Sequence, residues 1–345
     1  MMEFSPVLIA VDASGGDYAP QEIVKGAAAA ASEYNVPIAL LGNKKILTML
    51  AGKYEKKTNL SIIHAPQTIA CDEQPVQALK AKPRSSIVIG VGMVKEGKAS
   101  AFISAGSTGA VLASSYMMLG KLTNIQRPAL ATVIAVNPEH PFILIDAGAN
   151  ADCIPAYLAQ FALMGSVFAA EHLNIEKPRV ALLNNGSEEG KGNRLTRESH
   201  QAIKLTPGIN FTGNIEPQDL LANHADVVVT DGFTGNIVLK TLEGFGENFG
   251  KNVGWQQSHH IPHELQGSAL VNYAKVLFLT KRADYKEFGG ACLLGLDGNI
   301  VVAHGRSKAK AVKSAIHLAV RAVELDMVSS IKQAMLKIAQ NTAQE

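Results

Sequence analysis

Short runs of apolar, mostly β-branched residues recur along the chain, and most are followed by a loop rich in Gly, Asn and Asp and then by a helix-like stretch. The runs do not alternate between apolar and polar residues, which is typical of strands buried on both faces of a mainly parallel sheet. Strands that alternate with helices predict an open α/β fold. The predicted strands are residues 7–11, 38–41, 61–64, 101–104, 142–145, 179–183, 209–212 and 225–230. The predicted helices are residues 21–34, 108–121, 155–172, 193–204 and 236–249.

The pattern changes near residue 250. Residues 250–286 contain helical stretches without a strand, and we expect a helical protrusion there. Two short strands then flank Asp297-Gly298, a pair that is typical of β-hairpins. Residues 307–341 keep a helical spacing of apolar side chains and predict a C-terminal helical tail. Because there is neither an internal repeat nor a Pro/Gly linker, we predict a single domain over residues 1–345, built as a three-layer α/β/α sandwich.

The charge balance excludes several classes of protein. The chain has 32 basic and 30 acidic side chains, a net charge of +2, and it lacks the basic excess with which nucleic-acid-binding proteins neutralise phosphates. Hydrophobic residues make up 47% of the chain, too many for a disordered protein. No apolar run reaches the roughly 18 residues of a membrane span. We therefore expect a folded protein without a nucleic-acid partner.

The cysteines and the N-terminus indicate the compartment. Cys71, Cys153 and Cys292 lie far apart and form no Cys-x-x-Cys pair. An odd number of distant cysteines favours buried free thiols over a disulfide framework or a zinc site. The N-terminal apolar run has no basic segment before it and ends in a turn rich in Gly and Asp, which favours a first strand over a signal peptide. We expect a cytoplasmic protein.

Six loops after the predicted strands are rich in small residues and in Asn, Asp, Ser or Thr. Ligands of open α/β sheets bind beyond the carboxyl ends of the strands, so these loops are candidates for a site. One such loop is ordinary turn chemistry. Six of them at the same end of one sheet predict a shared polar site. The loops are residues 12–17, 104–109, 146–150, 184–193, 213–216 and 231–236.

Three features of these loops suit an anionic ligand. Residues 107–109 begin a predicted helix whose first amides attract negative charge, although a plain helix cap explains the same pattern. Lys191 lies in a loop that resembles a Walker A sequence with the wrong spacing, and it is either a solvated lysine or a ligand-binding one. Lys240 follows Asn236 by four residues and shares its helix face. Nucleotide fingerprints, metal-binding histidine clusters and a G-x-S-x-G elbow are absent from the sequence.

Nine motifs occur in order over nearly the whole chain: DASGGD, SAGSTGA, RPALA, DAGANADC, PRVALLNNGSEEGKGN, NFTGNIE, ADVVVTDGFTGNIVLKTLEG, FGGACLLG and AHG. Together they resemble the bacterial phosphate acyltransferase family, also called fatty acyl-carrier-protein:phosphate acyltransferases. The resemblance implies a fold related to phosphotransacetylases and isocitrate-dehydrogenase-like enzymes. It implies an enzyme that makes acyl phosphate from a long-chain acyl carrier protein thioester and inorganic phosphate, which then feeds a glycerol-3-phosphate acyltransferase of phospholipid synthesis. It also implies a homodimer with peripheral membrane contact and no cofactor.

The chain departs from the family pattern at four positions. Ser14 and Tyr18 stand where family members usually have Met and His, Asn185 replaces an apolar residue, and Phe288 replaces a common Tyr. A phenol is not a base near neutral pH, so we assign no base role to Tyr18.

On this hypothesis phosphate is its own nucleophile, and it needs charge neutralisation and alignment against the thioester carbonyl. Lys191 and the amides of residues 107–109 would hold phosphate, with Lys240 as a second cation. Three asparagines would donate hydrogen bonds to phosphate or to the oxyanion, and three aspartates would orient the lysines and loops. The asparagines are Asn193, Asn214 and Asn236, and the aspartates are Asp12, Asp146 and Asp231. The other predicted substrate-binding residues are Gly15, Gly16, Ser107, Thr108, Gly109, Asn150 and Gly235, and we predict no metal ligand.

Several alternatives stay open at this point. The rivals are a nucleotide-using enzyme on a similar fold, a phosphotransacetylase that acts on short acyl-coenzyme A, and a non-catalytic module that binds lipid or a carrier protein. The apolar stretch 265–279 suits a dimer interface, an acyl chain or a membrane surface. A basic run is either a solvated face or a surface for an acidic carrier protein or anionic lipid. This run is Arg306, Lys308, Lys310 and Lys313.

Overall fold

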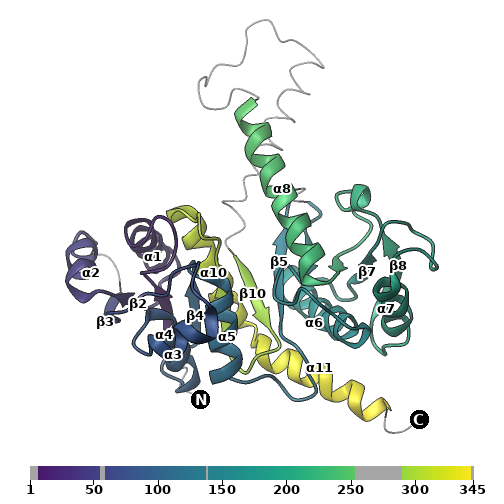
Figure 1. The fold of residues 1–345 in the computed structure, drawn as a ribbon, viewed down its shortest axis with the longest axis horizontal. Helices are drawn as coiled ribbons and strands as arrows, with labels where there is room; N and C mark the ends of the chain where they lie inside the picture. Colours follow the sequence, from purple (N-terminus) through teal and green to yellow (C-terminus); the bar gives the residue numbers. More distant parts are fainter. Residues whose placement is uncertain (1–6, 55–58, 137–138, 253–289, 343–345) are drawn as a thin grey trace, which may run out of the picture.

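The computed structural model describes residues 7–54, 59–136, 139–252 and 290–342. In these residues eleven strands form one sheet, in the order β3-β2-β1-β4-β11-β10-β5-β6-β9-β7-β8 (Figure 1). The strands are β1 (Ile9–Asp12), β2 (Ile38–Gly42), β3 (Leu60–His64), β4 (Ala101–Ser104), β5 (Ala129–Ile134), β6 (Phe142–Ile145), β7 (Arg179–Leu183), β8 (Asn210–Ile215), β9 (Val227–Val229), β10 (Ala291–Leu294) and β11 (Asn299–Val302). All eight predicted strands are present, and the two strands around Asp297-Gly298 form the predicted antiparallel hairpin β10–β11.

Helices cover both faces of the sheet. One face packs against α1 (Gln21–Tyr34), α2 (Lys44–Ala51), α6 (Pro155–Leu173), α7 (Arg194–Lys204), α10 (Ala309–Glu324) and α11 (Met327–Thr342). The other face packs against α3 (Pro75–Ala81), α4 (Ser86–Lys95), α5 (Thr108–Met118) and α8 (Gly232–Asn252). The two apolar clusters lie on opposite sides of the strands, which confirms the predicted α/β/α sandwich with a mostly parallel sheet.

The sheet consists of two parallel halves that run in opposite directions. Strands β3, β2, β1, β4 and β11 are parallel to one another, and so are β6, β9, β7 and β8. Between them, β10 is antiparallel to both β11 and β5, and β5 is antiparallel to β6. The loops after β1 and β4 therefore lie at one end of the sheet, and the loops after β6, β7, β8 and β9 lie at the other. The prediction that all six polar loops share one end is wrong, because this reversal was not visible in the local sequence.

Small residues bring the helices close to one another on the first face. The helix α1 is rich in alanine, and Ala27 and Ala30 are fully buried. A Cβ at Gly26 would lie 2.6 Å from the carbonyl oxygen of Ala309, so α1 and the start of α10 approach more closely than a larger residue allows. The abundance of alanine and glycine in the chain thus serves close helix packing.

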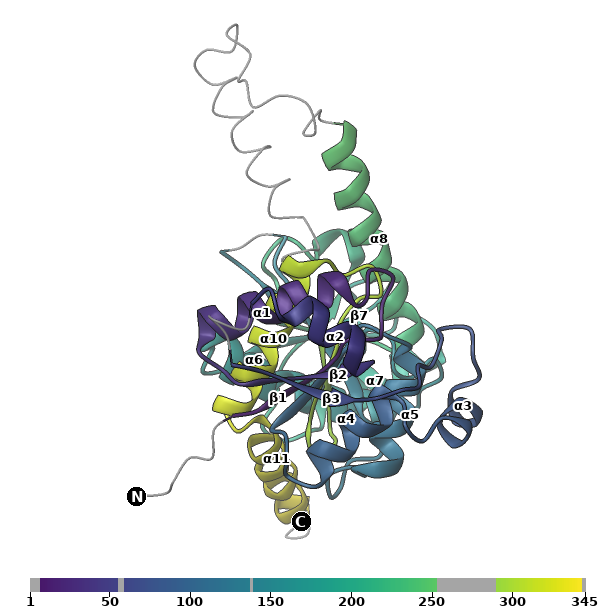
Figure 2. The ribbon, with the colours of Figure 1, turned by 90° about the vertical axis from the view of Figure 1, so that its left-hand side faces the viewer.

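The last third of the chain differs in part from the prediction. The C-terminal tail is two helices, because the chain turns between α10 and α11 at Asp326, where φ is 45°. The helix α8 projects away from the sheet in both views (Figures 1 and 2), and Asn252 is its last residue. The remainder of the predicted protrusion, with the apolar stretch 265–279, lies outside the described residues. The single domain over residues 1–345 stays a prediction.

Candidate active site

A groove crosses the middle of the sheet where its two halves meet. Its volume is about 340 Å³, within the range of sites that bind small molecules. Its lining comes from the start of α5, from β5, from the loop after β6, from α8, and from the chain between β11 and α10. Because β5 runs from one end of the sheet to the other, loops from opposite ends contribute to one cavity.

The floor of the groove is largely apolar. Leu130, Thr132 and Ile134 alternate along β5 and point to the same face, as a strand requires. Leu239 and Leu242 of α8 line the groove as well. Strand β5 is not among the predicted strands, although the β-branched run at residues 132–134 is a signal for it. The apolar floor suits a ligand with an aliphatic part.

Polar side chains gather along the groove from three elements. Thr108 comes from the first turn of α5, and His304 from the loop after β11. Asn236, Lys240 and Glu243 lie on one face of α8, as their spacing of four and three residues requires. The groove therefore joins an apolar floor to a cation, a carboxylate, an amide, an imidazole and the start of a helix.

Asp12 holds the loop after β1. Its buried carboxylate accepts hydrogen bonds from the amides of Ser14 (2.9 Å) and Gly15 (3.1 Å) and from the Ser104 hydroxyl (2.7 Å). Burial raises the pKa of Asp12, and its hydrogen bonds, the first from Ser86, act against this rise. Gly15 packs against Gly106, because a Cβ there would lie 2.7 Å from the Gly106 nitrogen. Asp12 thus binds the loop after β1 to Ser104 at the end of β4.

The loop after β11 is tied to the same two loops. The Ala303 amide donates to the Ser104 carbonyl (2.9 Å), and the Asp17 amide donates to the Gly305 carbonyl (2.8 Å). Gly16 has a φ of 105° beside Gly305, a conformation that favours glycine. Three loops at this end of the sheet form one connected frame around His304.

Asp146 holds the loop after β6 at the other end of the sheet, as Asp12 holds the loop after β1. Its fully buried carboxylate accepts from the amides of Leu130, Gly148 and Ala149 and from the backbone and side-chain nitrogens of Asn150, all at 2.7–3.0 Å. Burial raises the pKa of this carboxyl, and the same hydrogen bonds oppose the rise. Asn150 also donates to the carbonyl of Pro128 (2.8 Å). Asp146 therefore joins the loop after β6 to the first residues of β5.

The start of α8 packs against the loop after β6. Asp231 caps the helix through the Thr234 amide (2.9 Å) and hydroxyl (2.8 Å). The Gly232 amide donates to the Asn150 carbonyl (2.7 Å), and Gly235 lies against the Asp146 carbonyl oxygen. These contacts aim Asn236 and Lys240 into the groove.

Lys191, Asn193 and Asn214 form a separate cluster after β7 and β8, outside the lining of the groove. Asn193 caps α7 through the Thr196 amide (2.9 Å). Asn214 donates to the Glu188 carbonyl (2.9 Å) and contacts His200 Nδ1 (2.9 Å). The Lys191 ammonium lies 4.0 Å from Glu188, and 56% of its side chain is exposed. This cluster lies at the same end of the sheet as the loops after β6 and β9, which lead to Gly148 and Asn236.

The structure thus divides the predicted site residues into three groups. Thr108, Asn236 and Lys240 line the groove, whereas Lys191, Asn193 and Asn214 do not. The others support loops: Asp12, Gly15, Gly16, Ser107, Gly109, Asp146, Asn150, Asp231 and Gly235. Ser107 is the plain cap of α5, since its hydroxyl accepts from the Ala110 amide (3.4 Å). His304 also lines the groove and is not among the predicted site residues, although the AHG motif contains it.

The three cysteines are free thiols that differ in exposure. Cys292 is buried, Cys153 is half-buried, and Cys71 is exposed, so the prediction of three buried thiols is wrong for Cys71. Burial raises the pKa of Cys292 to about 12 and, with the negative charge of Asp146, raises the pKa of Cys153 to about 12. Within the described ranges, no three His, Cys, Asp or Glu residues cluster as metal ligands would.

Similar proteins identify the chain. The sequence family described as "Fatty acid synthesis protein" matches residues 7–330. A phosphate acyltransferase of Dehalococcoides mccartyi is 52% identical over 318 residues, which cover 92% of this chain and 91% of that protein. A phosphate acyltransferase of Dictyoglomus thermophilum is 44% identical over 96% of this chain and 98% of its own length.

Solved structures share the fold at low sequence identity. A phosphotransacetylase from Streptococcus pyogenes has a TM-score of 0.58 at 18% identity, over 95% of this chain and 94% of its own. A branched-chain phosphotransacylase from Enterococcus faecalis has a TM-score of 0.55 at 15% identity, over 92% of this chain and 99% of its own.

The relatives define the protein as an acyltransferase. The chain belongs to the fatty acid synthesis protein family whose members include the phosphate acyltransferases. Among the described helices, none is both long and apolar enough to cross a membrane.

Proposed function

We propose that the chain transfers a long-chain acyl group from an acyl carrier protein thioester to inorganic phosphate and forms acyl phosphate. The observation that carries this proposal is the groove, in which an apolar floor along β5 adjoins Lys240, Asn236 and the first turn of α5. The family and the names of its relatives support phosphate as the acceptor. The product would feed glycerol-3-phosphate acylation in phospholipid synthesis.

The polar part of the groove would bind the phosphate. The first amides of a helix have no partner within the helix and attract anions. At α5 the Ser107 hydroxyl accepts from the Ala110 amide, so the amides of Thr108 and Gly109 remain without a partner within the helix, and Thr108 lines the groove. Lys240 supplies a positive charge, and Asn236 a neutral donor. Together they would hold phosphate and align one of its oxygens with the thioester carbon.

The transfer is direct, from carrier thioester to phosphate. A phosphate oxygen forms a bond to the carbonyl carbon, the carbon–sulfur bond breaks, and the electron pair leaves with the carrier thiolate. Thiolates are the nucleophilic form of cysteine, and the raised pKa values of Cys153 and Cys292 keep both thiols protonated. Ser107 is occupied as a helix cap. A covalent acyl-enzyme would contradict direct transfer.

Partner surfaces follow from the same proposal. Arg306, Lys308 and Lys310 are exposed next to residues that line the groove, and an acidic carrier protein would approach there. Lys313 is paired with Glu33 (2.8 Å) and contributes less. A homodimer, peripheral membrane contact and proximity to the glycerol-3-phosphate acyltransferase belong to the proposal as well. Light scattering and vesicle sedimentation test the first two.

The decisive assay uses the purified chain, inorganic phosphate and palmitoyl-acyl carrier protein, with acyl phosphate trapped as its hydroxamate. Reactions without phosphate correct for direct attack of hydroxylamine on the thioester. Parallel reactions contain palmitoyl-coenzyme A or acetyl-coenzyme A. We expect phosphate-dependent product with the carrier-protein donor. Product from acetyl-coenzyme A alone would instead establish phosphotransacetylase activity, and no product with any carrier-protein donor would overturn the proposal.

A further inference from the structure

His304 lies in the groove on a loop that the surrounding frame holds in place. The Ala303 amide binds the Ser104 carbonyl (2.9 Å), and the Ser307 amide binds the carbonyl of His304 itself (2.9 Å). At the start of α10, the Ala309 amide binds the Glu22 carboxylate (2.8 Å). The ring therefore has a defined position opposite α8, which carries Lys240.

A backbone contact selects the tautomer of His304. The Arg306 amide donates a hydrogen bond to Nδ1 at 3.1 Å. Only an unprotonated ring nitrogen accepts a hydrogen bond, and a neutral imidazole carries its single proton on the other nitrogen. With Nδ1 as the acceptor, the single proton of a neutral imidazole ring lies on Nε2.

The protonated nitrogen points toward α8. Nε2 lies 3.6 Å from Glu243 Oε2, and Glu243 follows Lys240 by three residues on the same helix face. The ring is thus oriented by an amide at one nitrogen and by a carboxylate beside the other. A fixed N–H group at the edge of a groove is the arrangement that stabilises developing negative charge.

We propose that His304 is a catalytic residue that donates its Nε2–H to the thioester oxygen as the tetrahedral intermediate forms. The inference rests on the proposed function. The phosphate oxygen attacks the carbonyl carbon, the carbonyl π electrons move onto oxygen, and Nε2–H stabilises that oxyanion. When the oxyanion collapses, the carbon–sulfur bond breaks and thiolate leaves. No proton is transferred, so His304 acts as a donor and not as a base.

Substitutions of His304 can distinguish a hydrogen-bond donor from a base. In His304→Gln the side-chain amide nitrogen reaches the position of Nε2 and still donates a hydrogen bond, whereas His304→Asn is polar but too short. We expect kcat to fall about 100-fold in His304→Asn and His304→Ala, the loss typical of one missing oxyanion donor. We expect His304→Gln to stay within about tenfold of the wild type. The KM for phosphate should be unchanged in all three.

His64 provides the matched control. Its Nδ1 also accepts a backbone amide, that of Lys44 at 3.3 Å, but it lies at the end of β3 outside the groove lining. His64→Ala should leave kcat unchanged. Thermal unfolding of each variant shows whether it is folded, and His304→Gln with His304→Asn decides the matter if His304→Ala does not fold.

The other outcomes would overturn either this inference or the proposed function. If His304→Gln is as inactive as His304→Asn, and the acid limb of the pH profile disappears in both, His304 is a base and the inference is overturned. A raised KM for phosphate with unchanged kcat would make it a phosphate ligand and also overturn it. An active wild type with a fully active His304→Asn removes this inference alone, whereas an inactive wild type removes the proposed function.

Discussion

The carbonyl oxygen of Asp146 occupies the space that a Cβ at Gly235 would need. Gly235 lies in the first turn of α8, and Asp146 follows β6. The contact holds α8 against the loop whose shape the Asp146 carboxylate determines, and it thereby positions Asn236 and Lys240 in the groove. Only glycine allows this approach without movement of the backbone.

Replacing Gly235 by alanine should therefore displace α8 and damage both stability and activity. Overpacking costs about 1–3 kcal/mol of unfolding free energy, and a misplaced Asn236 should reduce kcat/KM more than tenfold. Denaturant unfolding and the hydroxamate assay measure the two effects. Among the described residues, no atom lies within 4 Å of a Cβ built at Gly244 on the same helix, so Gly244→Ala should be neutral or stabilising by about 0.5–1 kcal/mol. Equal behaviour of the two variants would contradict the contact.

The sequence predicts a helix here but not the loop after β6 against which this helix packs. Local patterns predict every described strand except β5, because a β-branched run flanked by Gly and Asn is visible within ten residues. The reversal of the sheet between β11 and β6 depends on pairing across β5 and β10, which lie far apart in the chain. The position of Lys191 relative to the groove depends on that reversal. For the same reason the sequence could not distinguish residues that support loops, such as Asp12 and Asp146, from residues that line a cavity.

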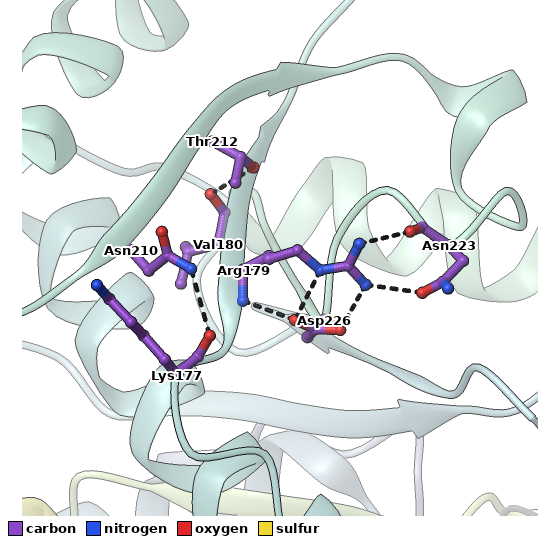
Figure 3. A network of polar contacts seen from close by, with 7 residues as sticks. All are labelled: Lys177, Arg179, Val180, Asn210, Thr212, Asn223 and Asp226. Atoms are coloured by element: carbon purple, nitrogen blue, oxygen red, sulfur yellow. Dashed lines mark hydrogen bonds and ion pairs between the residues drawn. The ribbon is translucent and has the colours of Figure 1, made fainter.

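Arg179 and Asp226 join the start of β7 to the residues before β9 (Figure 3). The guanidinium donates to both carboxylate oxygens (3.0 and 2.8 Å), and the Arg179 amide donates to Asp226 Oδ2 (2.7 Å). The guanidinium also donates to the carbonyl and side-chain oxygens of Asn223, both at 2.7 Å. Burial alone would raise the pKa of Asp226, but Arg179 outweighs it and holds the pKa below its usual value of 3.8.

Arg179→Met should destabilise the protein by about 1–2 kcal/mol, because it leaves a nearly buried carboxylate without its cation. The figure is modest because 38% of the arginine side chain is exposed and solvent screens the pair. The loss should be full well above pH 3.8 and should shrink as pH falls through 3.8 to the lower pKa of folded Asp226, below which this carboxyl is protonated in both states. Urea unfolding at several pH values measures this. Lys98→Met, which breaks the exposed pair with Glu96 (2.6 Å), should leave the free energy of unfolding nearly unchanged.

His172 should make stability depend on pH. Burial first, and then the charges of Arg321 and His317, lower its pKa from 6.5 to about 4, and the ring stacks on Phe168. Between these two values the unfolded chain binds a proton that the folded chain does not. The free energy of unfolding therefore falls as pH falls through this window, by up to about 3 kcal/mol, and is fully retained above pH 6.5.

His172→Phe should remove this dependence. Nδ1 of His172 has no hydrogen-bond partner among the described residues, so an apolar ring loses no bond at that atom. Thermal unfolding between pH 4 and pH 7 should show a shallower slope for His172→Phe than for the wild type. His140 is exposed, and His140→Phe should keep the wild-type slope. Parallel slopes for the wild type and His172→Phe would show that the buried histidine is not the cause.

The two candidate phosphate cations can be separated by mutation. Lys240 lines the groove, whereas Lys191 does not and is near Glu188. A charge-assisted hydrogen bond contributes about 1.5–3 kcal/mol, so Lys240→Ala should raise the KM for phosphate about 10–100-fold. Lys191→Ala should change it less than about tenfold. Lys332 on α11 is exposed, and Lys332→Ala should have no effect. A larger loss in Lys191→Ala than in Lys240→Ala would move the phosphate site to the loop after β7 and leave the groove to the acyl chain.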